Sequence, residues 1–225
     1  MARAFCIPGI IFLLCATVLS FLVSISLPFL PALDVARTHL PGQAIVNGQP
    51  VTELRVGVWA PCTYSPSGDR ICATSHHGYS ISISNVNKDS GVVIGGGWTR
   101  GLAIHPVATA VTFIALLLSF STHVTVTLLA SLVSFLAALL TLIAFACDIA
   151  LYAFLKHKAK EVNDIRANTN TAPGFWLTFV ALILTLLAGC TVCFGRRKDR
   201  MANASAYPMT EKKTPFWQRF RRNRV

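Results

Sequence analysis

One carboxylate lies inside an apolar block of the sequence, and it is the first candidate for chemistry. Asp148 is the single charge between Val124 and Leu155. An ionisable side chain within a membrane span is costly and is treated as a functional candidate by default. Counting back by helical steps of three and four reaches Ala144, Thr141, Ala137, Ser134 and Ala130. We therefore expect Asp148 on a face of small residues that packs closely against other helices.

Two residues could pair with this carboxylate. His105 and Arg100 are expected at a similar depth on the preceding apolar segment. A polar latch between helices is the simpler interpretation of such a pair. The alternative is an Asp–His pair that titrates and shifts the bundle when it changes protonation. The sequence leaves both open, and we favour the latch.

Cys62 and Cys72 lie outside the apolar blocks, on either side of a turn-rich stretch. Two such cysteines in an oxidising compartment should pair. Closing this short loop would stabilise the fold by about 3 kcal/mol in the chain-entropy model. A metal site needs more ligands at closer spacing, and only His76 and His77 are near. We therefore predict a disulfide.

The remaining polar residues form no catalytic set. A lone carboxylate provides neither a paired acid and base, nor metal ligands, nor a nucleophile with its base. The run Gly95-Gly96-Gly97 lacks the Lys-Ser/Thr of a phosphate-binding loop, and we interpret it as a flexible approach to the second span. We expect no enzymatic activity, no cofactor and no bound metal.

The elements that must position Asp148 follow from the distribution of hydrophobic residues. The chain is 53% hydrophobic and 13% charged, and its apolar residues form blocks long enough to cross a bilayer. The predicted spans are about 7–30, 102–120, 124–155 and 175–194. Residues 1–195 are therefore predicted to form one membrane domain, an all-α four-helix bundle.

The loop between the first two spans, residues 31–101, shows strand patterning. Leu54, Val56 and Val58 alternate with polar residues or glycine, and so do Tyr79, Ile81 and Ile83. Such period-two alternation predicts half-buried strands. Residues 92–94 give a third, weaker candidate. We predict a small antiparallel sheet outside the membrane.

Basic residues set the predicted orientation. Residues 196–225 contain ten Lys and Arg, and cytoplasmic flanks carry such an excess. Both termini should therefore be cytoplasmic, with residues 196–225 as a basic tail. We expect this tail to bind anionic lipid of the inner leaflet rather than nucleic acid. The expected lipid contacts are Arg196, Arg197, Lys198, Trp217, Arg219, Arg221 and Arg222.

Two cysteines close to this tail are candidates for modification. Cys190 and Cys193 lie at the inner end of the fourth span, where S-acylation occurs. Buried cysteines of the span are an equally good interpretation.

Short motifs in a fixed order indicate a family. The segment from Gly57 through Trp59 to Cys62, followed by Cys72 and by Arg100 before the second span, resembles the claudin pattern. A closer resemblance is to the fungal PalI family of pH-response regulators, which is related to eisosome-associated tetraspans. Its motifs correspond here to His77-Gly78-Tyr79-Ser80, His105-Pro106-Val107-Ala108, Ala144-Phe145 and Asp148-Ile149.

The resemblance implies a function and a location. It suggests a claudin-like, non-enzymatic protein of the plasma membrane that assists signalling of ambient alkaline pH. Its partner would be a separate seven-span pH sensor of the PalH type, which it would localise or stabilise. The alternative is a structural organiser of membrane domains or cell contacts. Self-association into a homo-oligomer stays open.

Overall fold

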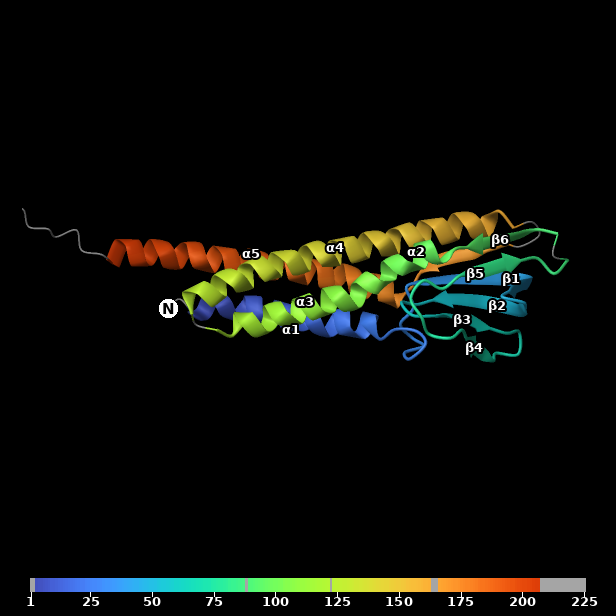
Figure 1. The fold of residues 1–225 in the computed structure, drawn as a ribbon, viewed down its shortest axis with the longest axis horizontal. Helices are drawn as coiled ribbons and strands as arrows, with labels where there is room; N and C mark the ends of the chain where they lie inside the picture. The colour runs from blue at the N-terminus through green and yellow to red at the C-terminus, as the bar shows by residue number, and fades with distance from the viewer. Residues whose placement is uncertain (1–2, 88, 122, 163–165, 207–225) are drawn as a thin grey trace, which may run out of the picture.

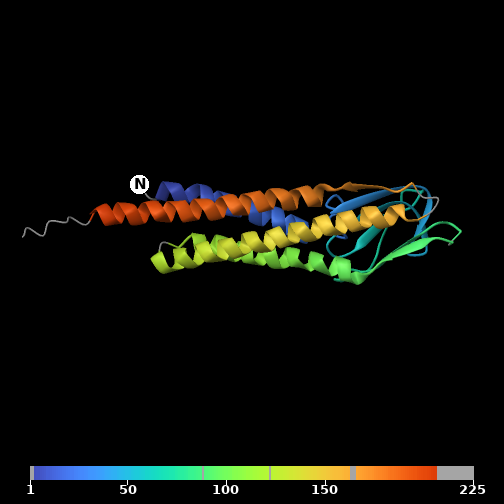
Figure 2. The ribbon, with the colours of Figure 1, turned by 90° about the horizontal axis from the view of Figure 1, so that it is seen from above.

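Four long helices form an elongated bundle, and a small β-sheet covers one end of it (Figure 1). The computed structural model describes residues 3–87, 89–121, 123–162 and 166–206, with side chains described except at 3–6, 42–43, 124 and 192–206. The long helices are α1 (Arg3–Ser24), α3 (Ile104–Ser119), α4 (Val124–Lys160) and α5 (Pro173–Ala206). Helix α1 lies beside α5, and α3 lies beside α4 (Figure 2). Contacts of α1 with α3 and of α4 with α5 close the bundle.

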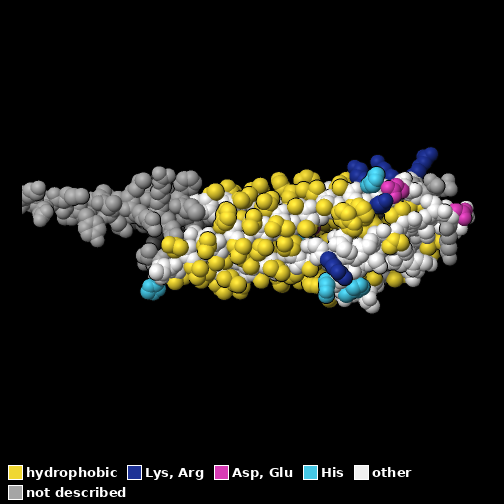
Figure 3. Space-filling model, turned by 45° about the horizontal axis from the view of Figure 1, so that its top comes forward, with side chains coloured by type: hydrophobic (Ala, Val, Ile, Leu, Met, Phe, Trp, Pro, Cys, Tyr) yellow, Lys and Arg dark blue, Asp and Glu magenta, His cyan; other side chains and the backbone are white. Residues whose placement is uncertain are grey.

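The helical section has the surface of a membrane protein. Four helical stretches within the described residues are long and apolar enough to cross a bilayer, namely Ile7–Ser24, Gly96–Ser119, Thr125–Lys160 and Pro173–Thr191. Apolar side chains cover this section, whereas charged side chains gather at the end with the sheet (Figure 3). A chain with this surface is a multi-pass membrane protein. The predicted fold class, a four-helix membrane bundle with a small antiparallel sheet, is confirmed.

The helix ends differ from the predicted spans for local reasons. Helix α1 stops at Ser24, before Pro28 and Pro31, because proline has no N–H to continue a helix. Helix α4 continues to Lys160, five residues beyond the predicted 155. Its last turns remain helical where Leu155 and Ala159 are fully buried. Helix α5 also runs past residue 194 and ends at Ala206.

The sheet is antiparallel and draws on two loops. Its strands are β1 (Ala36–Val46), β2 (Gln49–Val56), β3 (Pro61–Tyr64), β4 (Arg70–Cys72), β5 (Ile81–Ser84), β6 (Gly91–Ile94) and β7 (Asn168–Thr171). The order is β4-β3-β2-β1-β5-β6, with β7 paired to the first residues of β1. The β1–β2 turn contains Asn47 (φ 48°) and Gly48 (φ 86°), the positive dihedrals that a tight two-residue hairpin requires.

A hydrophobic core joins the sheet to the bundle. Sheet residues Leu54, Ile81 and Ile83 belong to the same buried cluster as Leu102 and Leu151 from the helices. Each of these side chains is 1% exposed or less. Helix ends and sheet therefore pack as one unit, which fixes the position of every residue at the junction.

Candidate functional site

The buried carboxylate of α4 meets a histidine of α3. His105 Nε2 lies 3.0 Å from Asp148 Oδ1, and the two side chains are 4% and 0% exposed. His105 stands in the first turn of α3, which begins at Ile104. Two proton arrangements fit this geometry, because a neutral carboxyl can donate to the ring nitrogen or the ring N–H can donate to a carboxylate. The pair therefore links two helices and can hold a proton between them.

The second oxygen of this carboxylate stands alone. Asp148 Oδ2 is buried and has no hydrogen-bond partner among the described residues. A buried acceptor without a partner costs roughly 1–3 kcal/mol. The bundle therefore holds this carboxylate at a cost in folding free energy.

Small residues of α4 line the helix face that carries Asp148. Ala130, Ser134, Ala137, Thr141 and Ala144 are all 2% exposed or less and lie on the face of Asp148. Ser134 and Thr141 donate their hydroxyl protons to the carbonyls of Ala130 and Ala137. Their polar groups are thus satisfied within α4, and neighbouring helices can approach the backbone closely.

Arg100 is not part of this pair, in contrast to the predicted shared depth. It is exposed and ends a short helix, α2 (Gly96–Arg100), which a 3₁₀ turn separates from α3. A Cβ at Gly78 would lie 2.6 Å from Arg100 Cγ, so the arginine packs over that glycine. Gly78 also has φ 76°, a dihedral that favours glycine.

The glycine run before α3 is also not a flexible approach. Gly95 is the N-cap of α2, and Gly96 and Gly97 belong to its first turn. A Cβ on Gly96 would collide with the carbonyl oxygen of Gly78. Gly96 and Gly78 therefore allow two backbone segments to touch where the sheet meets the helices.

The motif around Trp59 docks the sheet onto α1. Trp59 Nε1 donates a hydrogen bond of 2.6 Å to the carbonyl oxygen of Ser24, the last residue of α1. The Val58 amide donates to Ser26 Oγ at 3.1 Å. A Cβ on Gly57 would stand 2.4 Å from Leu27 Cβ. The phenol of Tyr79 donates to the carbonyl of Gly57, so both family motifs meet at this contact.

Cys62 and Cys72 form a disulfide between β3 and β4. The two residues face each other in the strand register. The bond ties the edge strand β4 to the rest of the sheet. Pro106, which belongs to the family motif that begins at His105, lies in the first turn of α3, where its missing N–H costs no helical bond.

Sequence reasoning missed a charged cluster on the sheet. The Asp34 side chain is fully buried and accepts two hydrogen bonds of 2.9 Å from Arg37. Glu53 lies 3.3 Å from Arg37 and 2.7 Å from Arg55. The hydrogen bond to Asp34 raises the pKa of Arg37 above its ordinary value. The sequence feature that could have indicated this charged cluster is the i,i+3 spacing of Asp34 and Arg37.

The predicted tail contacts fall mostly outside the described residues. Trp217, Arg219, Arg221 and Arg222 lie beyond Ala206. The backbone of residues 196–198 is helical, but the side chains of Arg196, Arg197 and Lys198 are not described, nor is that of Cys193. Cys190 is an exposed free cysteine. S-acylation and lipid contact therefore stay predictions.

Groups of three or more metal-ligating side chains do not occur in the described part of the chain. In a comparison with known families, residues 5–188 match the SUR7/PalI family. No individual curated protein matches the chain.

Proposed function

The chain belongs to the SUR7/PalI family, and on this basis we propose that it is a non-enzymatic protein of the plasma membrane that assists the sensing of ambient alkaline pH. In this function it localises or stabilises a separate seven-span sensor of the PalH type. The observation that carries the proposal is the match over residues 5–188, which includes the sheet, the first three spans and the fourth span as far as Ala188.

The orientation we propose places the sheet outside the cell and both termini in the cytoplasm. The disulfide Cys62–Cys72 lies in the sheet, and disulfides persist on the oxidising side of the membrane. The ten basic residues of 196–225 favour the opposite side. An impermeant maleimide tests this orientation. In a Cys62→Ser variant it should label Cys72 on intact cells, and labelling only after permeabilisation would reverse the topology.

The sheet and the nearby helix ends are the surface we propose for the sensor. They carry the charged side chains seen in Figure 3, while apolar side chains cover the helical section in that view. Below this surface, the pair of His105 and Asp148 acts as a latch that holds α3 and α4 in fixed positions relative to each other. Arg100 stands at the junction, exposed and without an ion pair among the described residues.

A strain that lacks this protein tests the proposal directly. We expect poor growth after a shift to alkaline medium and failure of the sensor to reach the plasma membrane. Re-expression of the intact chain should restore both. Normal growth and normal sensor localisation in the deletion strain would refute the pH function.

The proposed surface has its own test. An Arg100→Glu variant should recover less sensor by co-purification than the intact chain, because it reverses an exposed charge at the junction. Arg100→Lys is the matched control, since it keeps the exposed positive charge at the same position. Equal recovery with both variants would exclude Arg100 from the contact.

The alternative is a structural organiser of plasma-membrane domains. The observation that favours it is that the match covers the SUR7 and PalI branches together. Altered membrane patches with a normal alkaline response in the deletion strain would support this alternative.

A further inference from the structure

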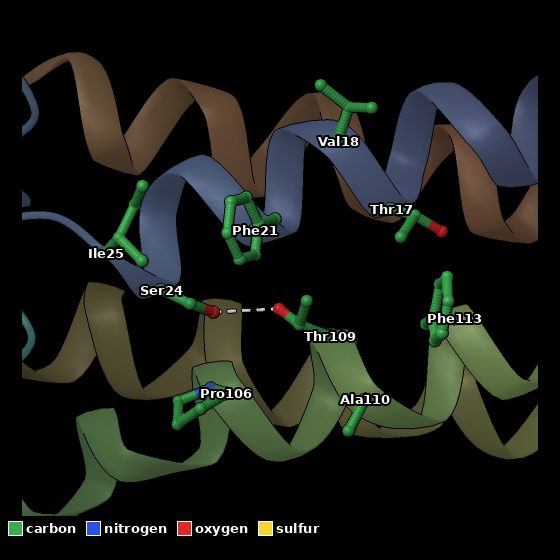
Figure 4. A pocket seen from close by; sticks show the side chains of 9 residues that line it. All are labelled: Thr17, Val18, Phe21, Ser24, Ile25, Pro106, Thr109, Ala110 and Phe113. Carbon is green, nitrogen blue, oxygen red and sulfur yellow. Dashed lines mark hydrogen bonds between the residues drawn. The ribbon is translucent and has the colours of Figure 1, made fainter.

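The bundle has an apolar groove on its lipid-facing surface, between α1 and α3 (Figure 4). Its volume is about 570 Å³. The walls include Phe21 and Val18 from α1 and Phe113 from α3, and these three side chains are 49–54% exposed. The groove lies on helical stretches that cross the membrane, so a membrane component must fill it.

Three hydroxyl groups line the groove: Thr17 donates its proton to the carbonyl of Leu13 at 2.7 Å, and the other two meet at the end near the sheet. Ser24 Oγ and Thr109 Oγ1 lie 2.8 Å apart across the gap between the two helices (Figure 4). Ser24 is the last residue of α1. Thr109 comes five residues after Ile104 at the start of α3, which is about 7.5 Å along a helix. The hydroxyl pair therefore lies just inside the apolar layer, and the rest of the groove runs deeper.

The protons of this pair are already committed. Ser24 Oγ is within 2.9 Å of the carbonyl of Ser20, and Thr109 Oγ1 is within 2.9 Å of the carbonyl of His105. Two hydroxyl protons thus serve three short contacts. Each hydroxyl oxygen has two lone pairs, so the pair can accept a hydrogen bond from a ligand but has no proton left to donate.

Because the hydroxyl pair can only accept a hydrogen bond, a lipid that binds here must present a hydrogen-bond donor. The ester region of a diacyl phospholipid presents carbonyl oxygens, which only accept. A sterol carries one hydroxyl, which can donate, at the end of its ring system nearest the membrane surface. Its rigid rings extend into the hydrocarbon, as this groove does from Ser24 toward Phe113. Phe21 and Phe113 project toward the space between the helices (Figure 4), and the small side chain of Ala110 also lines the groove.

We propose that this groove binds a membrane sterol, with the sterol hydroxyl donating to the Ser24–Thr109 pair and the rings lying along Phe21, Ala110 and Phe113. The inference does not depend on the proposed function in pH sensing. It assigns a ligand class to a surface that the bundle presents to lipid.

Photolabelling of the intact chain in nanodiscs tests the site. A diazirine sterol with a free 3β-hydroxyl should label peptides of α1 and α3, and unlabelled sterol should compete. The 3-keto analogue accepts but cannot donate, so it should compete about fivefold less well, the loss of one hydrogen bond. Equal competition by the ketone, or stronger competition by ceramide or diacyl phospholipid, would overturn the proposal.

Two variants separate the groove from general lipid contact. Ala110→Leu fills the groove from an exposed position and should reduce labelling at least about fivefold. Ala146→Leu is the control, because Ala146 is exposed on α4 away from the groove. Equal labelling of the two variants would refute the site. So would crosslinking of α1 and α3 to a helix of another protein or of a second copy with no sterol labelled.

Discussion

The indole nitrogen of Trp59 and the carbonyl oxygen of Ser24 are joined by a hydrogen bond of 2.6 Å. This bond connects the motif of the sheet to the last residue of α1, where the carbonyl has no helical partner of its own. The same serine contributes its hydroxyl to the pair with Thr109 on α3. One residue thus links the sheet, α1 and α3, and its environment determines how rigidly the sheet stands on the bundle.

Replacing Trp59 by phenylalanine should weaken this junction. The substitution keeps an aromatic ring but leaves the Ser24 carbonyl without its donor, at a cost of roughly 1–2 kcal/mol. We expect a lower midpoint in thermal unfolding of the detergent-purified protein. Trp98→Phe is the control, since Trp98 is 46% exposed and stacks on Phe154 at 4.1 Å, a contact that phenylalanine retains. Equal losses in both variants would argue against a specific function of the indole N–H.

Gly78→Ala should destabilise the protein through two separable effects. The positive φ of 76° strains any side chain, at about 1 kcal/mol, and the new Cβ meets Arg100 Cγ. Gly68→Ala is the matched control, because Gly68 has φ 91° but open space around it. Adding Arg100→Ala should recover the steric part alone. A Gly78→Ala variant as stable as Gly68→Ala would show that the arginine moves aside freely.

The helices and the buried face of α4 were predictable because their signals are local. Hydropathy blocks mark the spans, and helical periodicity alone places Asp148 among small residues. The partner of Asp148 was not decidable between His105 and Arg100 from the sequence. Both residues lie near the start of the same span, and which of them meets α4 is decided by contacts between helices that a local pattern does not contain.

The sheet was only partly predictable. Alternation marked the segments around Leu54 and Ile81, which are β2 and β5, and the apolar run at residues 92–94 marked β6. Strand β1 was missed because Pro41 and Gly42 in its centre suggest a turn. Strand β7 contains no apolar residue, and its burial comes from pairing with β1, where Thr169 and Thr38 hydroxyls lie 3.1 Å apart. Contacts between residues 131 positions apart in the chain leave no trace in a local window.

A double-mutant cycle on His105 and Asp148 should show strong coupling. His105→Leu leaves a buried carboxyl without its partner, which costs about 3 kcal/mol or more. Asp148→Leu likewise leaves the buried imidazole of His105 without its partner. The double variant removes both polar groups and should be more stable than the sum of the single losses predicts. Chemical unfolding of the three variants in detergent measures this, and additive losses would mean that the two groups do not act as a latch.

Tyr79 should make the sheet sensitive to strongly alkaline solution. Its phenol is buried and donates to the Gly57 carbonyl, and burial raises the pKa of Tyr79 above its ordinary value. The folded protein therefore keeps this proton when the unfolded chain loses it, near pH 10. Above that pH the folded state binds more protons, so stability falls as pH rises, by at most about 1.4 kcal/mol per pH unit for one group. Unfolding measured from pH 8 to pH 11 should show this slope.

Tyr79→Phe separates that slope from the titration of other groups. The variant loses the hydrogen bond to Gly57, so it should be less stable by about 1 kcal/mol at pH 8. Because phenylalanine does not titrate, its stability should fall less steeply than that of the intact chain above pH 10. Tyr64→Phe is the control, since Tyr64 is only half-buried at the edge of β3. If Tyr79→Phe shows the same alkaline slope as the intact protein, the phenol of Tyr79 must already be open to solvent before the sheet unfolds.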